Sequence, residues 1–133
     1  MELENLLYSG VQLAHNFGAA AVVGLPAAAL WLQPAQPVHR KIAWLTLAAW
    51  LTQAASGAGF GTVSFFMEGE LPQIHYLALG ALCTKIGCAV LAVSLLSVYL
   101  LRRPAKQTAA LWCPLAILGA TALSAAAVLR WFS

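Results

Sequence analysis

Charged residues are scarce in this sequence. They make up 8% of the 133 residues, whereas a soluble domain carries roughly 25%. Hydrophobic residues account for 62% of the chain. A chain with so little charge cannot cover its surface with groups that face water, so it belongs in a lipid bilayer. The net charge is +3, and all charged residues but one flank the apolar runs; this distribution argues against a nucleic-acid partner.

The sequence also shows no evident cleavable signal peptide. Its first residues include Glu2 and Glu4 instead of the basic residues that open a signal peptide. The first apolar stretch, 6–32, is long enough to span a bilayer, so we expect it to be a retained helix. The three cysteines all lie inside apolar runs, and we interpret them as small packing residues, not as a disulfide framework.

Four apolar stretches predict an all-α integral membrane protein with four transmembrane helices. Helices are expected because each backbone group in lipid must be satisfied within its own segment. Short loops then force neighbouring helices into an up-down-up-down bundle, which is one domain over residues 1–133. The first loop is expected at 33–41, with His39 as an ordinary loop residue. The expected spans are residues 6–32, 42–66, 76–101 and 108–132.

Basic residues predict the orientation of the bundle. Arg40 and Lys41 follow the first span, and Arg102, Arg103 and Lys106 follow the third. The loop between the second and third spans carries no Lys or Arg. Because basic loops stay in the cytoplasm, both termini are expected outside. The sequence thus predicts a multi-pass protein of a bacterial-type inner membrane, with the lipid bilayer as a partner.

One charged residue, Lys85, lies inside an apolar stretch. A lysine in hydrocarbon is costly unless it faces a polar interior and finds a partner there. We therefore interpret Lys85 as a functional residue. Three roles are open: it can pair with an anionic ligand such as a haem propionate, gate a cation, or carry a proton.

Polar residues on the first span share a face with His15. Tyr8, Gln12 and His15 follow i, i+4, i+7 spacing, and Asn16 lies beside them. His15 and Lys85 are expected within about one helical turn of each other in depth, in the outer half of the membrane. The sequence predicts a His15–Lys85 pocket, with Gln12 and Asn16 as further candidates for cofactor contacts. Imidazole is both a common metal ligand and a haem axial ligand.

A second histidine, His75, stands at the expected outer mouth beside Glu68 and Glu70. It is either a solvated loop residue or a first capture point for a metal ion or a proton. Together, His15 and His75 are the candidate metal ligands. The chain has only two methionines, and one is Met1, so it offers little sulfur for a Cu(I) route.

Three segments resemble one known family. Residues 82–90, LCTKIGCAV, continue to 99–103, YLLRR, and are similar to the "LLLK-L-x-L-V…NRRR" helix of the copper resistance D family. Residues 13–20, LAHNFGAA, with Gly24, resemble the first histidine-bearing helix of that family. The pair Ser56-Gly57 resembles its "LTG" helix. This resemblance covers nearly the whole chain and implies copper handling at the outer side through His75 and His15, with a periplasmic metal donor as a partner.

A histidine in the first helix and a lysine in the third also resemble the HemJ-type protoporphyrinogen oxidases, which are four-helix proteins that bind haem b. The resemblance implies that His15 is the axial ligand and that Lys85 is an essential partner. The chain departs from this family in two motifs. It lacks the tryptophan-glycine run after the first-helix histidine and the tryptophan-leucine-histidine lead into the lysine.

Three functions therefore stay open. The leading hypothesis is a copper-handling membrane protein that acts at the outer side, as the longer resemblance implies. The alternative is a haem b or quinone redox protein, which fits Lys85 better and would make the chain an oxidoreductase. The third is an accessory subunit of a larger membrane complex, because the alanine-rich stretch 109–127 has small faces suited to partner helices.

Overall fold

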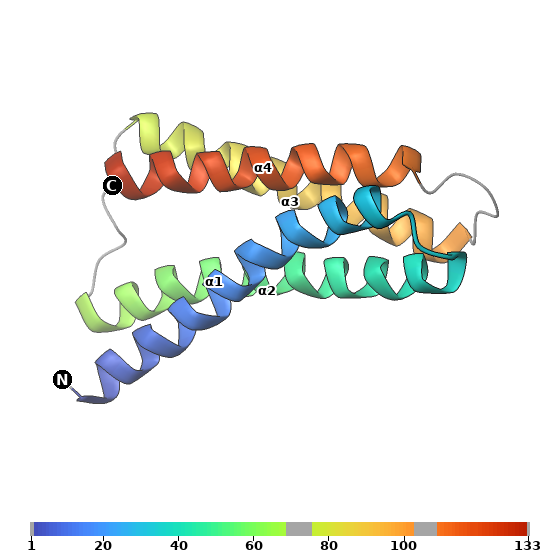
Figure 1. Ribbon diagram of the computed structural model, residues 1–133. Helices are drawn as coiled ribbons and strands as arrows, with labels where there is room; N and C mark the ends of the chain where they lie inside the picture. Colours follow the sequence, from blue (N-terminus) through green and yellow to red (C-terminus); the bar gives the residue numbers. More distant parts are fainter. Residues whose placement is uncertain (1, 69–75, 103–108, 133) are drawn as a thin grey trace.

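The computed structural model describes residues 2–68, 76–102 and 109–132, which form four α-helices and one short connection (Figure 1). The predicted all-α fold with four helices is confirmed. Each apolar stretch becomes one long helix, because a continuous helix satisfies its own backbone groups. The helices are α1 (Glu2–Leu32), α2 (Gln36–Glu68), α3 (Tyr76–Arg102) and α4 (Ala109–Phe132).

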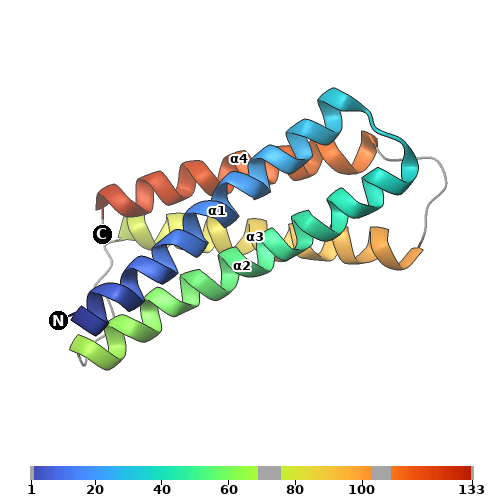
Figure 2. The same ribbon diagram turned by 60° about the horizontal axis from the view of Figure 1, so that its bottom comes forward.

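Each helix packs against two neighbours, so the four form a ring in cross-section. The contacts join α1 with α2, α2 with α3, α3 with α4, and α4 with α1. Helices α1 and α3 are therefore one diagonal pair, and α2 and α4 are the other. Both chain termini lie at one end of the bundle, here called the terminal end (Figures 1 and 2). The α1–α2 connection and the last turn of α3 lie at the other, the connection end.

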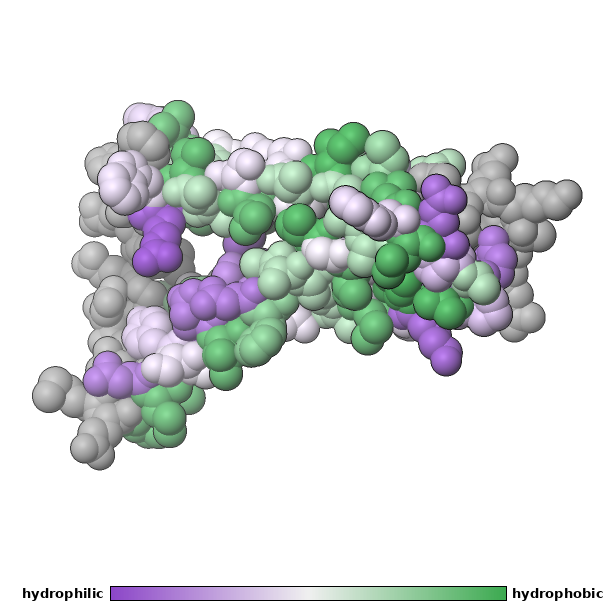
Figure 3. All heavy atoms as spheres, viewed as in Figure 1, coloured by the Kyte–Doolittle hydropathy of each residue, from purple (hydrophilic) through white to green (hydrophobic). Residues whose placement is uncertain are grey.

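Within the described residues, three helical segments are long and apolar enough to cross a membrane: Asn5–Leu32, Tyr76–Arg102 and Ala110–Trp131. Helix α2 has 33 residues, or about 50 Å at 1.5 Å per residue, but it is less apolar. Green, hydrophobic atoms cover much of the face drawn in Figure 3. Large apolar side chains that remain exposed include Phe17, Leu51, Ile86 and Ile117. Such a surface suits lipid.

The buried core lies mainly toward the connection end, where Leu96, Trp112 and Leu115 are fully buried. At the terminal end the two halves of the bundle separate. Figure 3 shows an opening between them, bordered by hydrophilic side chains. The molecule therefore combines a tightly packed half with a more open half.

The connection between α1 and α2 is shorter than the loop predicted at 33–41. Helix α2 begins at Gln36, so only residues 33–35 lie outside helices. Pro37 is tolerated because a first-turn residue needs no helical acceptor for its N–H. Gln33 ends α1 with a φ of 41° and donates its N–H to the Ala29 carbonyl at 3.2 Å. This is the αL form of a helix C-cap.

His39 is a buried helical residue, and its prediction as an ordinary loop residue was wrong. Its side chain is 6% exposed, and its ring stacks on Trp112 of α4 with 5.8 Å between ring centroids. Trp112 Nε1–H donates to His39 Nδ1 at 2.9 Å. The prediction failed because the loop is shorter than expected. Helix α2 already begins at Gln36, and this places His39 on the face that packs inside the bundle. This contact joins the diagonal pair α2 and α4.

Candidate functional site

His15 on α1 and Lys85 on α3 meet inside the bundle. Lys85 Nζ lies 3.1 Å from His15 Nε2, and both side chains are half-buried. Since α1 and α3 are diagonal, this contact crosses the centre of the bundle. The sequence predicted a similar depth for the two residues but left the rotation of their helices open. The rotation in the structure brings the two side chains together.

Helix α2 holds His15 at two points. The ring Nδ1 lies 2.7 Å from Ser56 Oγ, and the main-chain carbonyl accepts a hydrogen bond from Gln53 Nε2. Ser56 and Gln53 are both buried, and they lie on one face because they are three residues apart in a helix. Phe60 packs edge-on against the imidazole, with 5.6 Å between ring centroids. The ring is therefore fixed in both position and orientation.

Gly18 makes room for Gln53 between α1 and α2. A Cβ built at Gly18 would lie 2.8 Å from Gln53 Nε2 and 3.4 Å from the Ala49 carbonyl oxygen. A larger residue would have to displace the Gln53 amide. Gly18 thus allows the close approach of α1 and α2, as small residues do at helix interfaces.

The hydrogen bonds around His15 have a definite direction. The Ser56 hydroxyl donates to the Thr52 carbonyl at 2.7 Å, so its oxygen accepts from His15 Nδ1–H. An imidazole protonated at Nδ1 carries a lone pair at Nε2, and Lys85 donates to that lone pair. An ammonium group has three N–H donors, and among the described residues the structure gives Lys85 this one hydrogen bond. The other donors can serve an anion or a neutral acceptor inside the bundle.

The other two candidates for cofactor contacts, Gln12 and Asn16, bond to each other, and no hydrogen bond joins them to the side chains of His15 and Lys85 among the described residues. Both are exposed, and Gln12 Nε2 donates to Asn16 Oδ1 at 2.8 Å. They belong to the part of α1 that leads toward the terminal end. Their role as cofactor contacts stays a prediction.

His75, the second candidate metal ligand, lies outside the described residues, as does Glu70. Its expected cooperation with His15 therefore stays a prediction. Within residues 2–68, 76–102 and 109–132, no group of three or more His, Cys, Asp or Glu side chains is placed to hold a metal ion. His15 is the candidate metal ligand whose surroundings can be described, and those surroundings include a cation.

Two residues of the site, Ser56 and Gln53, were missed as functional residues by sequence reasoning. Ser56 entered the sequence analysis only through a family resemblance. The available signal was their spacing of three residues inside an apolar stretch. Two polar side chains on one face of a buried helix need hydrogen-bond partners in the bundle. His15 supplies a partner for each.

Comparison of the chain with protein-family models, with curated proteins and with solved structures found no match. The copper and haem functions that the two family resemblances imply are therefore proposals for this chain. Their support has to come from the geometry of the His15–Lys85 pair and its surroundings.

Proposed function

We propose that this chain is an integral membrane protein with four spans. In this proposal α2 crosses the membrane together with the three more apolar helices α1, α3 and α4. The support comes from packing: α2 lies between α1 and α3 in the ring, and both of these are long and apolar enough to cross a membrane. We also place the connection end in the cytoplasm of a bacterial-type inner membrane, with both termini outside. Arg40, Lys41 and Arg102 all belong to the connection end, in keeping with the positive-inside rule.

The function that we propose for this protein is haem b binding, in a redox or electron-transfer role. The single observation that carries it is the distance of 3.1 Å between Lys85 Nζ and His15 Nε2. It puts an imidazole lone pair, a common ligand of haem iron, beside an ammonium group that can pair with a carboxylate. Haem b has carboxylate propionates and, when bound, supplies one-electron redox chemistry.

The surroundings of His15 fit the role of an axial ligand. A ligating histidine donates its other ring N–H to an acceptor that fixes the ring, and Ser56 Oγ is such an acceptor at 2.7 Å. For His15 to hold the iron, Lys85 would have to move away from Nε2, which its flexible four-carbon stem allows. Its ammonium group would then be available to hold a propionate.

Copper handling at the outer side has weaker support. An ammonium group 3.1 Å from His15 Nε2 repels a cation that approaches this nitrogen. The second expected ligand, His75, lies outside the described residues. The accessory-subunit hypothesis likewise gains no observation from the described residues. Both remain predictions from the sequence.

An absorption spectrum of protein purified with haem supplied tests the proposal. We expect a Soret band in the wild type and its loss in His15→Ala. Lys85→Met is expected to retain less haem, and Lys85→Arg to restore part of it, because arginine keeps the positive charge. Thr121→Val is the matched control, since this exposed hydroxyl bonds only within α4, to the Ile117 carbonyl at 2.8 Å.

The same preparations distinguish the competing hypotheses. Absence of a Soret band from the wild type would overturn haem binding. Copper that co-purifies with the wild type and is lost in His15→Ala, without a Soret band, would favour the copper hypothesis instead. Both measurements use the intact protein in detergent or lipid.

A further inference from the structure

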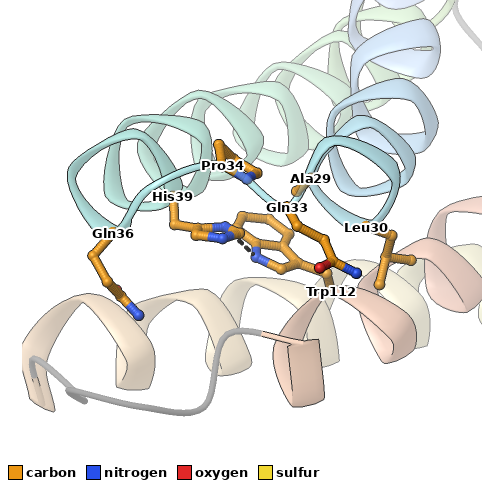
Figure 4. A pocket seen from close by; sticks show the side chains of 7 residues that line it. All are labelled: Ala29, Leu30, Gln33, Pro34, Gln36, His39 and Trp112. Carbon is orange, nitrogen blue, oxygen red and sulfur yellow. Dashed lines mark hydrogen bonds between the residues drawn. The ribbon is translucent and has the colours of Figure 1, made fainter.

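A pocket of about 320 Å³ lies at the connection end, between the α1–α2 connection and α4 (Figure 4). Ala29 of its wall is fourteen residues along α1 from His15, or about 21 Å at 1.5 Å per residue. The pocket is therefore separate from the His15–Lys85 pair. Its volume is in the range of small-molecule sites, roughly 300–1,000 Å³. None of its lining residues is charged, which favours a neutral ligand.

Trp112 determines which nitrogen of His39 is a donor. The indole N–H donates to Nδ1 at 2.9 Å, so Nδ1 carries a lone pair and the proton of the neutral ring lies on Nε2. No hydrogen bond engages Nε2 within the described part of the chain. Among the described residues, the one fully buried side-chain polar atom without a hydrogen-bond partner is Trp50 Nε1. The unpartnered Nε2 of His39 is therefore not fully buried. His39, which lines the pocket, thus offers an N–H donor that no described residue engages.

Two amides add to this donor. Gln33 and Gln36 line the same pocket, and Figure 4 shows their side chains on opposite sides of the stacked His39 and Trp112 rings. Each amide has two N–H donors and one acceptor oxygen. Ala29 and Leu30 supply apolar wall. The pocket therefore has amide groups on two sides of the stacked rings, and Ala29 and Leu30 form an apolar wall on the Gln33 side (Figure 4).

We propose that this pocket binds the head group of a membrane quinone. A quinone head group is a neutral planar ring with carbonyl acceptors on opposite edges, which matches donors on two sides and no charge. Its long apolar tail would lie along the outer surface of the helices. Trp31, 89% exposed at the end of α1, is the kind of aromatic residue found at the membrane interface, a level that a lipid-borne ring can reach.

Binding of the quinone does not depend on haem, so it is tested on protein purified without haem. The probe is a benzoquinone with a ten-carbon tail, titrated into the protein in detergent micelles. The readout is the indole N–H resonance of Trp112, identified among the five tryptophans by its absence in Trp112→Phe. Because this N–H bonds to the ring that receives the ligand, we expect a saturable shift of this resonance.

Variants and a matched probe give the test its outcomes. Gln33→Gly and Gln36→Ala each remove an exposed amide, and each is expected to weaken binding by about three- to tenfold, the usual effect of one hydrogen bond. His39→Phe keeps a ring on Trp112 but removes the donor, and is expected to weaken binding by about tenfold or more. Thr121→Val on the outside of α4 should bind as the wild type does.

The proposal is overturned if the same tail on a carbonyl-free benzene ring shifts the Trp112 resonance equally, because the pocket would then bind any apolar molecule. It is also overturned if Gln33→Gly and Gln36→Ala both bind like the wild type. A shift that is confined to the indole resonances of the other tryptophans also overturns the proposal. A missing Soret band in the haem experiment leaves all these outcomes unchanged, so the two proposals fail separately.

Discussion

Gly119 of α4 packs directly on the backbone of α1 at Val22. A Cβ built at Gly119 would lie 2.6 Å from the Val22 carbonyl oxygen and 3.4 Å from the Val23 Cα atom. Backbone atoms cannot rotate away as a side chain can, so Gly119→Ala must push α1 and α4 apart. We expect it to lower the free energy of unfolding by about 1–3 kcal/mol, the usual cost of overpacking. Unfolding by SDS in mixed micelles measures this value.

Gly24→Ala is the control for this substitution. It lies on α1, and a Cβ there meets no atom within 4 Å. Alanine favours a helix over glycine by up to about 1 kcal/mol, so Gly24→Ala should leave stability unchanged or raise it. Equal destabilisation by both substitutions would contradict the close approach at Gly119.

Ser56→Ala tests the hydrogen bond that orients His15. It leaves the Nδ1–H of a half-buried imidazole without its acceptor, at a cost of about 1–3 kcal/mol. We expect the ring to lose its single tautomer, which nitrogen-15 NMR of the histidine side chains reports directly. Ser124→Ala is the matched control, because Ser124 is exposed and bonds to the Ala120 carbonyl of its own helix. An unchanged His15 spectrum in Ser56→Ala would show that Ser56 does not set the tautomer.

Gln33→Gly is expected to stabilise the protein. Gln33 has a φ of 41°, in the left-handed region that costs a side-chain-bearing residue about 1 kcal/mol or more. Glycine adopts this conformation freely and is the usual residue at this C-cap position. SDS unfolding should show a gain of up to about 1 kcal/mol. A loss of stability would mean that the Gln33 side chain contributes more than the strain that it imposes.

The contact between His39 and Trp112 is expected to contribute measurable coupling energy between α2 and α4. A double-mutant cycle of His39→Phe and Trp112→Phe should give about 1–2 kcal/mol, because it removes a buried hydrogen bond. The comparison cycle pairs Trp112→Phe with Thr84→Val, an exposed residue that bonds within α3 to the Gly80 carbonyl. This second cycle should be additive. Additivity in both cycles would rule out an energetic link at His39.

The sequence was sufficient for the helices and for the depth of the main pair. Apolar length defined four helices, and counting residues put His15 and Lys85 at similar depth. It could not supply helix rotation, which depends on packing among all four helices. For the same reason it did not connect Ser56 and Gln53 with His15. It also misplaced His39, because the loop was expected to run to residue 41, whereas α2 begins at Gln36 and Pro37 fits inside its first turn.

The two histidines act as cross-braces for the bundle. Contacts along the four sides of a ring of helices fix the lengths of those sides, but they leave the cross-section free to shear from a square toward a rhombus. His15–Lys85 ties one diagonal, and His39–Trp112 ties the other nearer the connection end. A ligand that takes Lys85 away from His15 would release one brace and leave the second in place. Binding of such a ligand inside the bundle would then change the cross-section of the bundle at the terminal end alone.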